Sequence, residues 1–218
     1  MKKKVVIITS LLLIVTISIC VVLAFLTDSE ETTNTFTIGK VDISLYETAV
    51  NELGEPIEGA EPVTENTYHL LPGKTYVKDP TITVEAGSDE AYIRMVVTLN
   101  LYKEIKEVFG SDFLPENYVS GYNPDKWIYI GSEENTEKNT ITYEFRYYEP
   151  VDGFNNEVEE ELVLEPLFTS LVIPGEIEAN DLEKIADLEI KVVGHAIQKS
   201  GLDTADEAWN AFDKQYNE

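Results

Sequence analysis

The amino-acid sequence predicts an all-β fold in which antiparallel strands form a sandwich. Roughly seven to nine short segments alternate apolar and polar residues with a period of two, the pattern of strands with one buried face. Long loops rich in glycine, proline and acidic residues separate these segments, and helical periodicity is confined to a few stretches. The chain has 218 residues, of which 43% are hydrophobic. This is enough for one domain with a substantial core.

The first 24 residues have the composition of an export signal. Lys2–Lys4 precede nineteen residues, Val5–Leu23, that contain no charged side chain. A positive start before an apolar run is typical of a secretory signal helix, and the small residue Ala24 suits the position before a signal-peptidase cut. We therefore expect residues 1–24 to be removed by cleavage between Ala24 and Phe25. The alternative is a retained membrane anchor, because the run is just long enough to span a bilayer.

The only cysteine, Cys20, lies in this apolar run. Bulky Ile17 and Ile19 stand before it where a lipidation motif requires small residues, so a lipid anchor is not expected. The exported part of the chain has no cysteine and must be held together by burial and hydrogen bonding.

The first expected strand follows a polar segment. Phe36 and Ile38 share one face of an extended chain. A one-residue slip at Gly39 puts alternate residues of Val41–Leu45 on that same face, which indicates a strand with a β-bulge. Residues 47–66 are acidic and contain glycine and proline, so they are expected to form an exposed loop.

The later strands are easier to recognise. Two short strands are expected on either side of a turn at Pro72–Gly73. The clearest signal is residues 91–101, where Ile93, Met95 and Val97 alternate with more polar positions. Further strands are expected at Lys126–Ile130, Thr140–Tyr148, Leu167–Ile173 and Asp187–Ile197. Their aromatic residues are expected to pack in the core and across strands rather than to bind a ligand.

Helices are expected at the periphery of the sandwich. Tyr102–Phe109 and Asp181–Ala186 are short candidates. The strongest spans about 204–214, where Thr204 and Glu207 match the spacing of a capping box. One face of that helix is apolar, and it consists of Ala205, Ala208, Trp209 and Phe212.

The charge of the chain restricts its partners. There are 41 acidic and 16 basic residues, a formal charge of −25. Removal of residues 1–24 takes away three lysines and no acidic residue, which leaves 13 basic residues and a charge of −28. Nucleic acid and anionic membrane surfaces are therefore poor partners, because both require a basic face. The acidity is typical of a solvated surface, and it also suits cation binding or charge-controlled assembly.

The sequence contains no recognisable catalytic motif. His69 and His195 lie far apart and outside any zinc-binding pattern, and adjacent acidic residues are expected by chance in so acidic a chain. We therefore expect no enzyme activity, no catalytic residue and no metal site. Without a spaced acidic loop, calcium binding is expected to be weak at most.

Three stretches resemble the TasA/camelysin family of Gram-positive bacteria. The first is AFLTDSEETTNTFTIGKVDISL, from Ala24, where an apolar run precedes a polar segment and an F-x-x-G-x-V-D-I strand. The second is LLPGKTYVKDPTITVEAGSDEAYIRMVV, with Pro72–Gly73 and Tyr92–Arg94. The third is VVGHAIQKSGLDTADEAWNAF, with Ala208–Trp209. These stretches cover both ends and the middle of the chain in the family's order.

The resemblance implies a secreted, jelly-roll-like sandwich of residues 37–218 that belongs to the extracellular matrix or the cell or spore surface. It implies release by the dedicated signal peptidase SipW and self-assembly into head-to-tail fibres with other matrix proteins as partners. In such fibres residues 25–36 of one subunit would add a strand to the next. Four apolar side chains are the candidate anchors of this donor strand: Phe25, Leu26, Phe36 and Ile38.

Other interpretations stay open. Camelysin-like members imply a cell-surface metalloendopeptidase, although no zinc motif supports one here. The chain could also be a membrane-anchored adhesion or binding module that keeps Val5–Leu23. Residues 25–35 could instead be only a tail left by signal cleavage.

Overall fold

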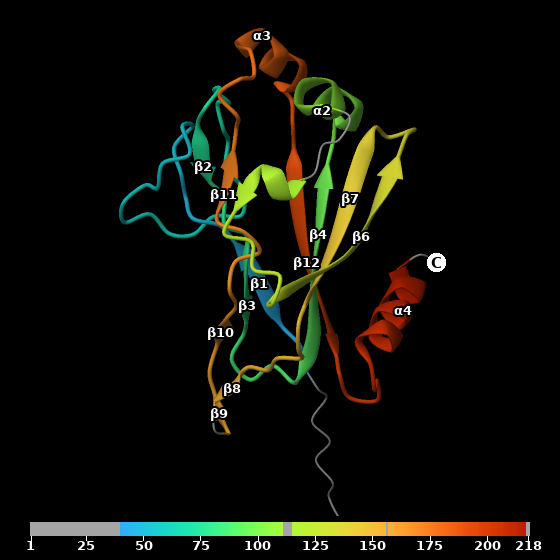
Figure 1. Ribbon diagram of the computed structural model, residues 1–218. Coiled ribbons are helices and arrows are strands. Elements are labelled where there is room, and N and C mark those ends of the chain that lie inside the picture. Colours follow the sequence, from blue (N-terminus) through green and yellow to red (C-terminus); the bar gives the residue numbers. More distant parts are fainter. Residues whose placement is uncertain (1–39, 111–114, 156, 217–218) are drawn as a thin grey trace, which may run out of the picture. The chain divides into compact units, whose positions relative to one another are not determined.

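The computed structural model describes residues 40–110, 115–155 and 157–216 (Figure 1). Most of this part of the chain forms antiparallel β-strands, with a few short helices, which confirms the β-rich prediction. The signal segment, the N-terminal donor segment and the bulge expected at Gly39 lie outside the described residues. Among the described residues no helix is both long enough and apolar enough to cross a bilayer.

The described strands and helices follow one another in a fixed order. The strands are β1 (Ile43–Tyr46), β2 (Thr75–Val77), β3 (Thr81–Val84), β4 (Ala91–Leu99), β5 (Val119–Ser120), β6 (Trp127–Asn135), β7 (Thr140–Tyr147), β8 (Phe154–Asn155), β9 (Val158–Glu159), β10 (Leu162–Val163), β11 (Ser170–Val172) and β12 (Ile190–Gln198). The helices are α2 (Tyr102–Phe109), α3 (Ala179–Leu182) and α4 (Ala205–Tyr216), with 3-10 turns η1 (Pro115–Asn117) and η2 (Glu183–Ile185).

Four antiparallel sheets are present in the described residues. The largest has the strand order β12-β4-β7-β6, with the long strand β4 in its interior. Two three-stranded sheets have the orders β1-β3-β10 and β2-β11-β5, and β8 and β9 form a two-stranded hairpin. Strands β4 and β12 pair over their full length, from Ala91 with Gln198 to Leu99 with Ile190.

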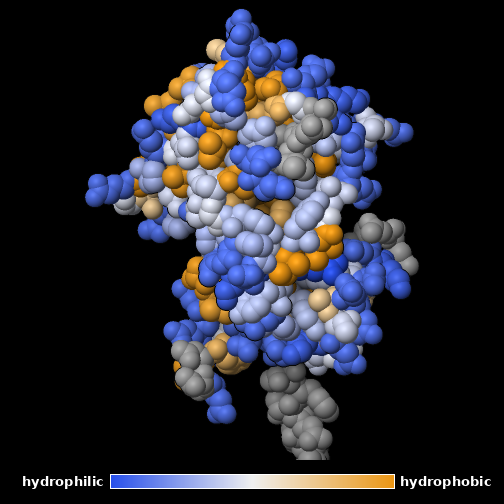
Figure 2. All heavy atoms as spheres, viewed as in Figure 1, coloured by the Kyte–Doolittle hydropathy of each residue, from blue (hydrophilic) through white to orange (hydrophobic). Residues whose placement is uncertain are grey.

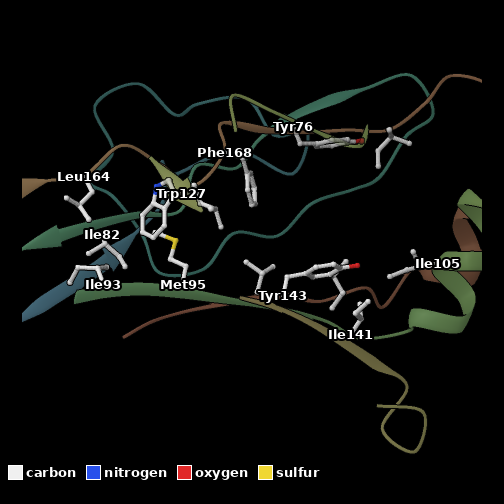
Figure 3. Close-up of a cluster of buried hydrophobic side chains, with 14 of the residues drawn as sticks. Tyr76, Ile82, Ile93, Met95, Ile105, Trp127, Ile141, Tyr143, Leu164 and Phe168 are labelled. Atoms are coloured by element: carbon white, nitrogen blue, oxygen red, sulfur yellow. The ribbon is translucent and has the colours of Figure 1, made fainter. Parts of the chain in front are cut away.

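The core lies between the four-stranded sheet and the strands and loops that face it (Figure 3). The period-two pattern of β4 predicts this correctly, since Ile93, Met95, Val97 and Leu99 are all buried. In Figure 3, Ile141 and Tyr143 lie on the side of the four-stranded sheet, and Tyr76 and Phe168 lie across from them. Trp127 is fully buried, and its indole N–H donates to the carbonyl oxygen of Glu165 at 2.9 Å.

One glycine allows strand β12 of the four-stranded sheet and strand β3 of a facing sheet to approach closely. A Cβ atom at Gly194, in β12, would stand 2.9 Å from Cδ1 of Ile82, in β3. Such a distance is too short for two carbon atoms, so a side chain at this position would push β12 away from the core or displace Ile82.

The prediction that residues 47–66 form an exposed loop is wrong for the first few of these residues, which are buried. Glu47, Ala49 and Val50 are buried. Glu47 forms a bridge with Val63 and Val50 forms one with Pro56, so the segment folds back on itself. The acidic composition obscured this burial, because Glu47 is buried with a charged partner.

The strands expected on either side of Pro72–Gly73 are also wrong, since β2 and β3 both follow that turn. The residues before it are held by a side chain instead of a partner strand. The hydroxyl of Tyr76 donates to the carbonyl oxygen of His69 at 2.8 Å and accepts from the N–H of Leu71 at 2.6 Å. A tyrosine hydroxyl thus supplies hydrogen bonds that a neighbouring strand would have supplied.

The helix predictions agree closely with the structure. Helix α2 has the expected bounds, and α3 with η2 covers the second candidate. At α4 the hydroxyl of Thr204 accepts from the N–H of Glu207 at 3.2 Å, as a cap should. The carboxylate of Glu207 accepts from the N–H of Asp203 rather than from that of Thr204, so the expected reciprocal bond is shifted by one residue.

Candidate functional site

The residues that the sequence singles out for release and assembly cannot be placed in this fold. The cleavage pair Ala24 and Phe25, and the donor anchors Leu26, Phe36 and Ile38, all lie outside the described residues. The described part of the chain offers sheet edges and polar clusters as candidate sites.

The two histidines lie in different surroundings. His69 is exposed in the segment before β2, where its backbone N–H donates to the carbonyl oxygen of Glu52. His195 lies in β12, and its Nδ1 accepts from Nε of Arg94 at 3.1 Å. Within the described ranges no group of three or more histidine, cysteine or acidic residues is arranged to hold a metal ion.

The four-stranded sheet ends in two nine-residue edge strands, β12 and β6, and β6 is the more exposed of the two. This strand ends the order β12-β4-β7-β6, so among the described strands it pairs with β7 alone. It spans nine residues, whereas the sequence indicated only the five from Lys126 to Ile130. An unpaired edge of this length presents backbone N–H and C=O groups to which another extended chain can bind.

Three consecutive apolar side chains are exposed at the start of β6. Ile128, Tyr129 and Ile130 are 42%, 50% and 46% exposed, respectively. Figure 2 shows hydrophobic residues gathered on this face, beside the course that β6 takes in Figure 1. A β-bulge interrupts the pairing with β7 between Tyr129 and Gly131. We call Ile128–Ile130 the β6 apolar edge.

The second half of β6 is protected against further pairing. Glu133 and Glu134 place negative charge there, and Glu134 lies 3.4 Å from Nζ of Lys106 in α2. Charged side chains are a usual device that prevents edge-to-edge association. The open part of the edge is therefore confined to its apolar beginning.

A second, shorter edge belongs to β10. Leu162 and Val163 are 40% and 58% exposed, and in the described residues β10 pairs only with β3. Two residues give very few backbone hydrogen bonds to an incoming strand. The β10 edge is therefore a useful comparison for the β6 apolar edge rather than an equal candidate.

The outer face of the four-stranded sheet is covered by α4 through Arg94. This arginine is 5% exposed, and its Nη2 lies 2.6 Å from Oδ1 of Asp213. Its guanidinium carbon lies 4.4 Å from the ring centre of Trp209 and 4.8 Å from that of Phe212. Arg94 thus joins the centre of the sheet to α4 by an ion pair and two cation–π contacts.

Charged groups on the neighbouring strands extend this contact. Glu144, in β7, lies 3.7 Å from Nη1 of Arg94 and accepts from Nε of Arg146 at 2.6 Å. Arg146 in turn donates to Asp206 of α4 at 2.6 Å. Burial and the positive charge of Arg94 both lower the pKa of His195, which favours its neutral form.

The sequence only weakly predicts this cluster of Arg94 and its partners. Arg94 is the single cation within an otherwise apolar and polar-neutral strand, which is a signal that it needs a partner. Its partner Asp213 stands 119 residues away, among many other acidic residues. The arrangement holds α4 against the outer face of the four-stranded sheet.

No protein-family model, curated protein or solved structure matches this chain.

Proposed function

We propose that this chain is a secreted structural protein of the extracellular matrix or cell surface, which assembles head to tail by strand addition. The observation that carries this proposal is the β6 apolar edge, an open strand edge with three consecutive exposed apolar side chains. The signal-like composition of residues 1–24, the excess of acidic residues and the lack of catalytic motifs in the sequence support it.

In this proposal the fold is a jelly-roll-like β-sandwich. Antiparallel sheets that face each other across one buried core support it, with Met95 on one side and Ile82 on the other. A sandwich suits a structural subunit, because its sheets end in edges to which a strand from a second copy can be added.

The proposed occupant of the edge is the segment 25–38 of a second copy. Phe36 and Ile38 would share one face of an added strand, and Phe25 and Leu26 could anchor its start. Backbone hydrogen bonds would supply affinity, and contact with Ile128–Ile130 would select the register.

Charge would control this assembly. Copies that each carry about −28 repel one another, and protonation, salt or divalent cations weaken that repulsion. Fibres should therefore form more readily at pH 4–5 or in millimolar calcium than at pH 7 in low salt.

The test compares residues 25–218 with residues 37–218 by negative-stain microscopy and sedimentation. Filaments from the longer form alone would support donation by the N-terminal segment. The acceptor is tested in the longer form with the pair Ile128→Lys and Ile130→Lys. The matched control is Leu162→Lys with Val163→Lys, which adds the same charge to the β10 edge.

The β6 pair should abolish filaments while the β10 pair leaves them intact, with unchanged circular dichroism in both. Filaments that survive the β6 pair would contradict the acceptor assignment. A longer form that stays monomeric from pH 4 to 7 and in calcium would contradict the assembly proposal itself.

A further inference from the structure

A buried polar cluster joins three segments at the end of the molecule that holds β2. Glu47 directly follows β1, Asn66 lies late in the loop 47–66, and Lys78 directly follows β2. Glu47 and Lys78 are buried, with 9% and 6% exposure, and Asn66 is half-buried. Burying an ammonium group and a carboxylate is costly, so their position together calls for an explanation.

One carboxylate contacts both an amine and an amide in this cluster. Oε1 of Glu47 lies 2.6 Å from Nζ of Lys78, and Oε2 accepts from Nδ2 of Asn66 at 3.4 Å. A base therefore contacts a potential nucleophile with one oxygen and the nitrogen of a potential leaving group with the other.

Backbone groups hold both ends of the Asn66 carboxamide, and one of them polarises its carbonyl group. Oδ1 accepts from the backbone N–H of Val50 at 3.0 Å, and Nδ2 also donates to the carbonyl oxygen of Thr48 at 2.9 Å. A backbone N–H aimed at the carboxamide oxygen is the arrangement that stabilises negative charge when a nucleophile adds to the carbonyl carbon.

Neighbouring groups hold the cluster in place and limit access of water. The ring centre of Tyr68 lies 5.9 Å from Nζ of Lys78. Asp79 accepts from both the N–H and the hydroxyl of Thr48, at 2.8 and 2.6 Å, and so fixes the residue next to Glu47. Ordered reactive groups in a partly dry site favour a slow reaction between side chains that would not react in water.

We propose that Lys78 and Asn66 form an intramolecular isopeptide bond, with Glu47 as the proton-transfer group. Glu47 first takes a proton from the Lys78 ammonium, and the neutral amine adds to Cγ of Asn66. The N–H of Val50 stabilises the resulting oxyanion on Oδ1. The bond from Cγ to Nδ2 then breaks as Glu47 delivers this proton to the departing nitrogen, and Glu47 passes a second proton from the attacking nitrogen to the ammonia that leaves.

The atoms of this reaction balance without an oxidant, a cofactor or another reactant. Of the three protons on the Lys78 ammonium, one stays on the new amide and two leave with Nδ2 as an ammonium ion. Glu47 ends as a carboxylate. The product joins the loop 47–66 to the end of β2 by a covalent bond, whether or not the protein assembles into fibres.

The first test is the intact mass of the purified mature chain. The bond removes ammonia, so the mass should be about 17 Da below that of the sequence. Trypsin should not cut at a modified Lys78, and Lys40, Lys74 and Arg94 define the neighbouring cuts. The digest should therefore contain residues 41–74 joined to residues 75–94, with fragment ions that place the bond at Asn66 and Lys78.

Two variants assign the roles. Lys78→Arg keeps the charge beside Glu47 but removes the nucleophile, and Glu47→Gln keeps the side-chain shape but removes the base. Both should have the full sequence mass when folded, as judged by circular dichroism. Asn66→Asp should still form the joined peptide, but with loss of water, about 18 Da, because lysine then adds to a carboxyl group instead of a carboxamide.

Full sequence mass for the folded, unmutated chain would overturn the proposal. It would also be overturned by a loss of about 17 Da that persists in Lys78→Arg, since that loss would come from cyclisation of an asparagine with its own backbone.

Discussion

The attachment of α4 to the sheet can be tested at Trp209. Its side chain is 1% exposed and lies against Phe212 and Arg94. It is also the one buried side chain in the described residues with an unpartnered polar atom, the indole Nε1. The buried ring therefore stabilises the fold while its unpartnered N–H destabilises it, and two substitutions separate these effects.

Trp209→Ala removes the whole ring and should reduce the free energy of unfolding by about 3–5 kcal/mol, the usual cost of such a cavity. Trp209→Phe keeps much of the apolar contact and relieves the desolvation of an N–H group, which costs about 1–3 kcal/mol. Its net cost should therefore stay below about 1.5 kcal/mol. Asn210→Ala, on the exposed face of the same turn, is the control and should change stability by less than about 0.5 kcal/mol.

The assay is urea unfolding at pH 7 followed by far-ultraviolet circular dichroism, together with hydrogen exchange of the α4 amides. Exchange is needed because a terminal helix can detach before the rest unfolds, which would hide the loss from a global measurement. If Trp209→Ala neither lowers the midpoint nor speeds exchange in α4, the docking of this helix is not energetically important. If Trp209→Phe costs as much as Trp209→Ala, the unpartnered N–H carries no penalty.

Three further outcomes follow from single contacts. The pKa of His195 is lowered in the fold from its ordinary value of 6.5, so below that pH the unfolded chain binds more protons than the folded chain and stability falls as the pH drops. His195→Gln should therefore reduce the change in the free energy of unfolding between pH 5 and 7, measured from the urea midpoints, by at most about 1.4 kcal/mol per pH unit. An unchanged slope would contradict the burial of the neutral ring. Thr204→Ala should cost about 1 kcal/mol through loss of its capping bond to Glu207, and equal thermal midpoints would refute that role. Gly194→Ala should cost about 1–3 kcal/mol because its Cβ would meet Ile82, and a melting temperature equal to that of the unmutated chain would show that the layers can separate freely.

Local patterns in the sequence predict the regular elements well. The alternation in β7, the buried inner face of β4 and the apolar face of α4 are properties of short segments, and the structure confirms them. In β4 the other face is also buried at Tyr92 and Arg94, which the alternation does not predict. The strands between Phe154 and Val163 were not predicted, because each is two residues long and their surroundings are acidic. Periodicity cannot identify a strand that contains only a single two-residue repeat.

The polar clusters could not be predicted for a different reason. Glu47 is one of 41 acidic residues, and nothing in its immediate neighbours shows that it is buried with Lys78. Such pairs depend on which distant segments the sheets bring together, and this information is absent from any single window of sequence. The open edge of β6 is likewise a property of strand order rather than of the strand itself.

The strand order of the largest sheet has a consequence for how the chain folds. Strand β4 lies in the interior of this sheet, yet one of its two neighbours is β12, and Arg94 and His195 stand 101 residues apart. The largest sheet therefore cannot close until nearly the whole chain has emerged from the ribosome. Pairings between residues so distant in sequence make folding slow, because the chain must lose much conformational entropy before they form. Until then the apolar face of β4 stays open, so the nascent chain should remain unfolded, and bound by chaperones, for longer than a domain built from local hairpins.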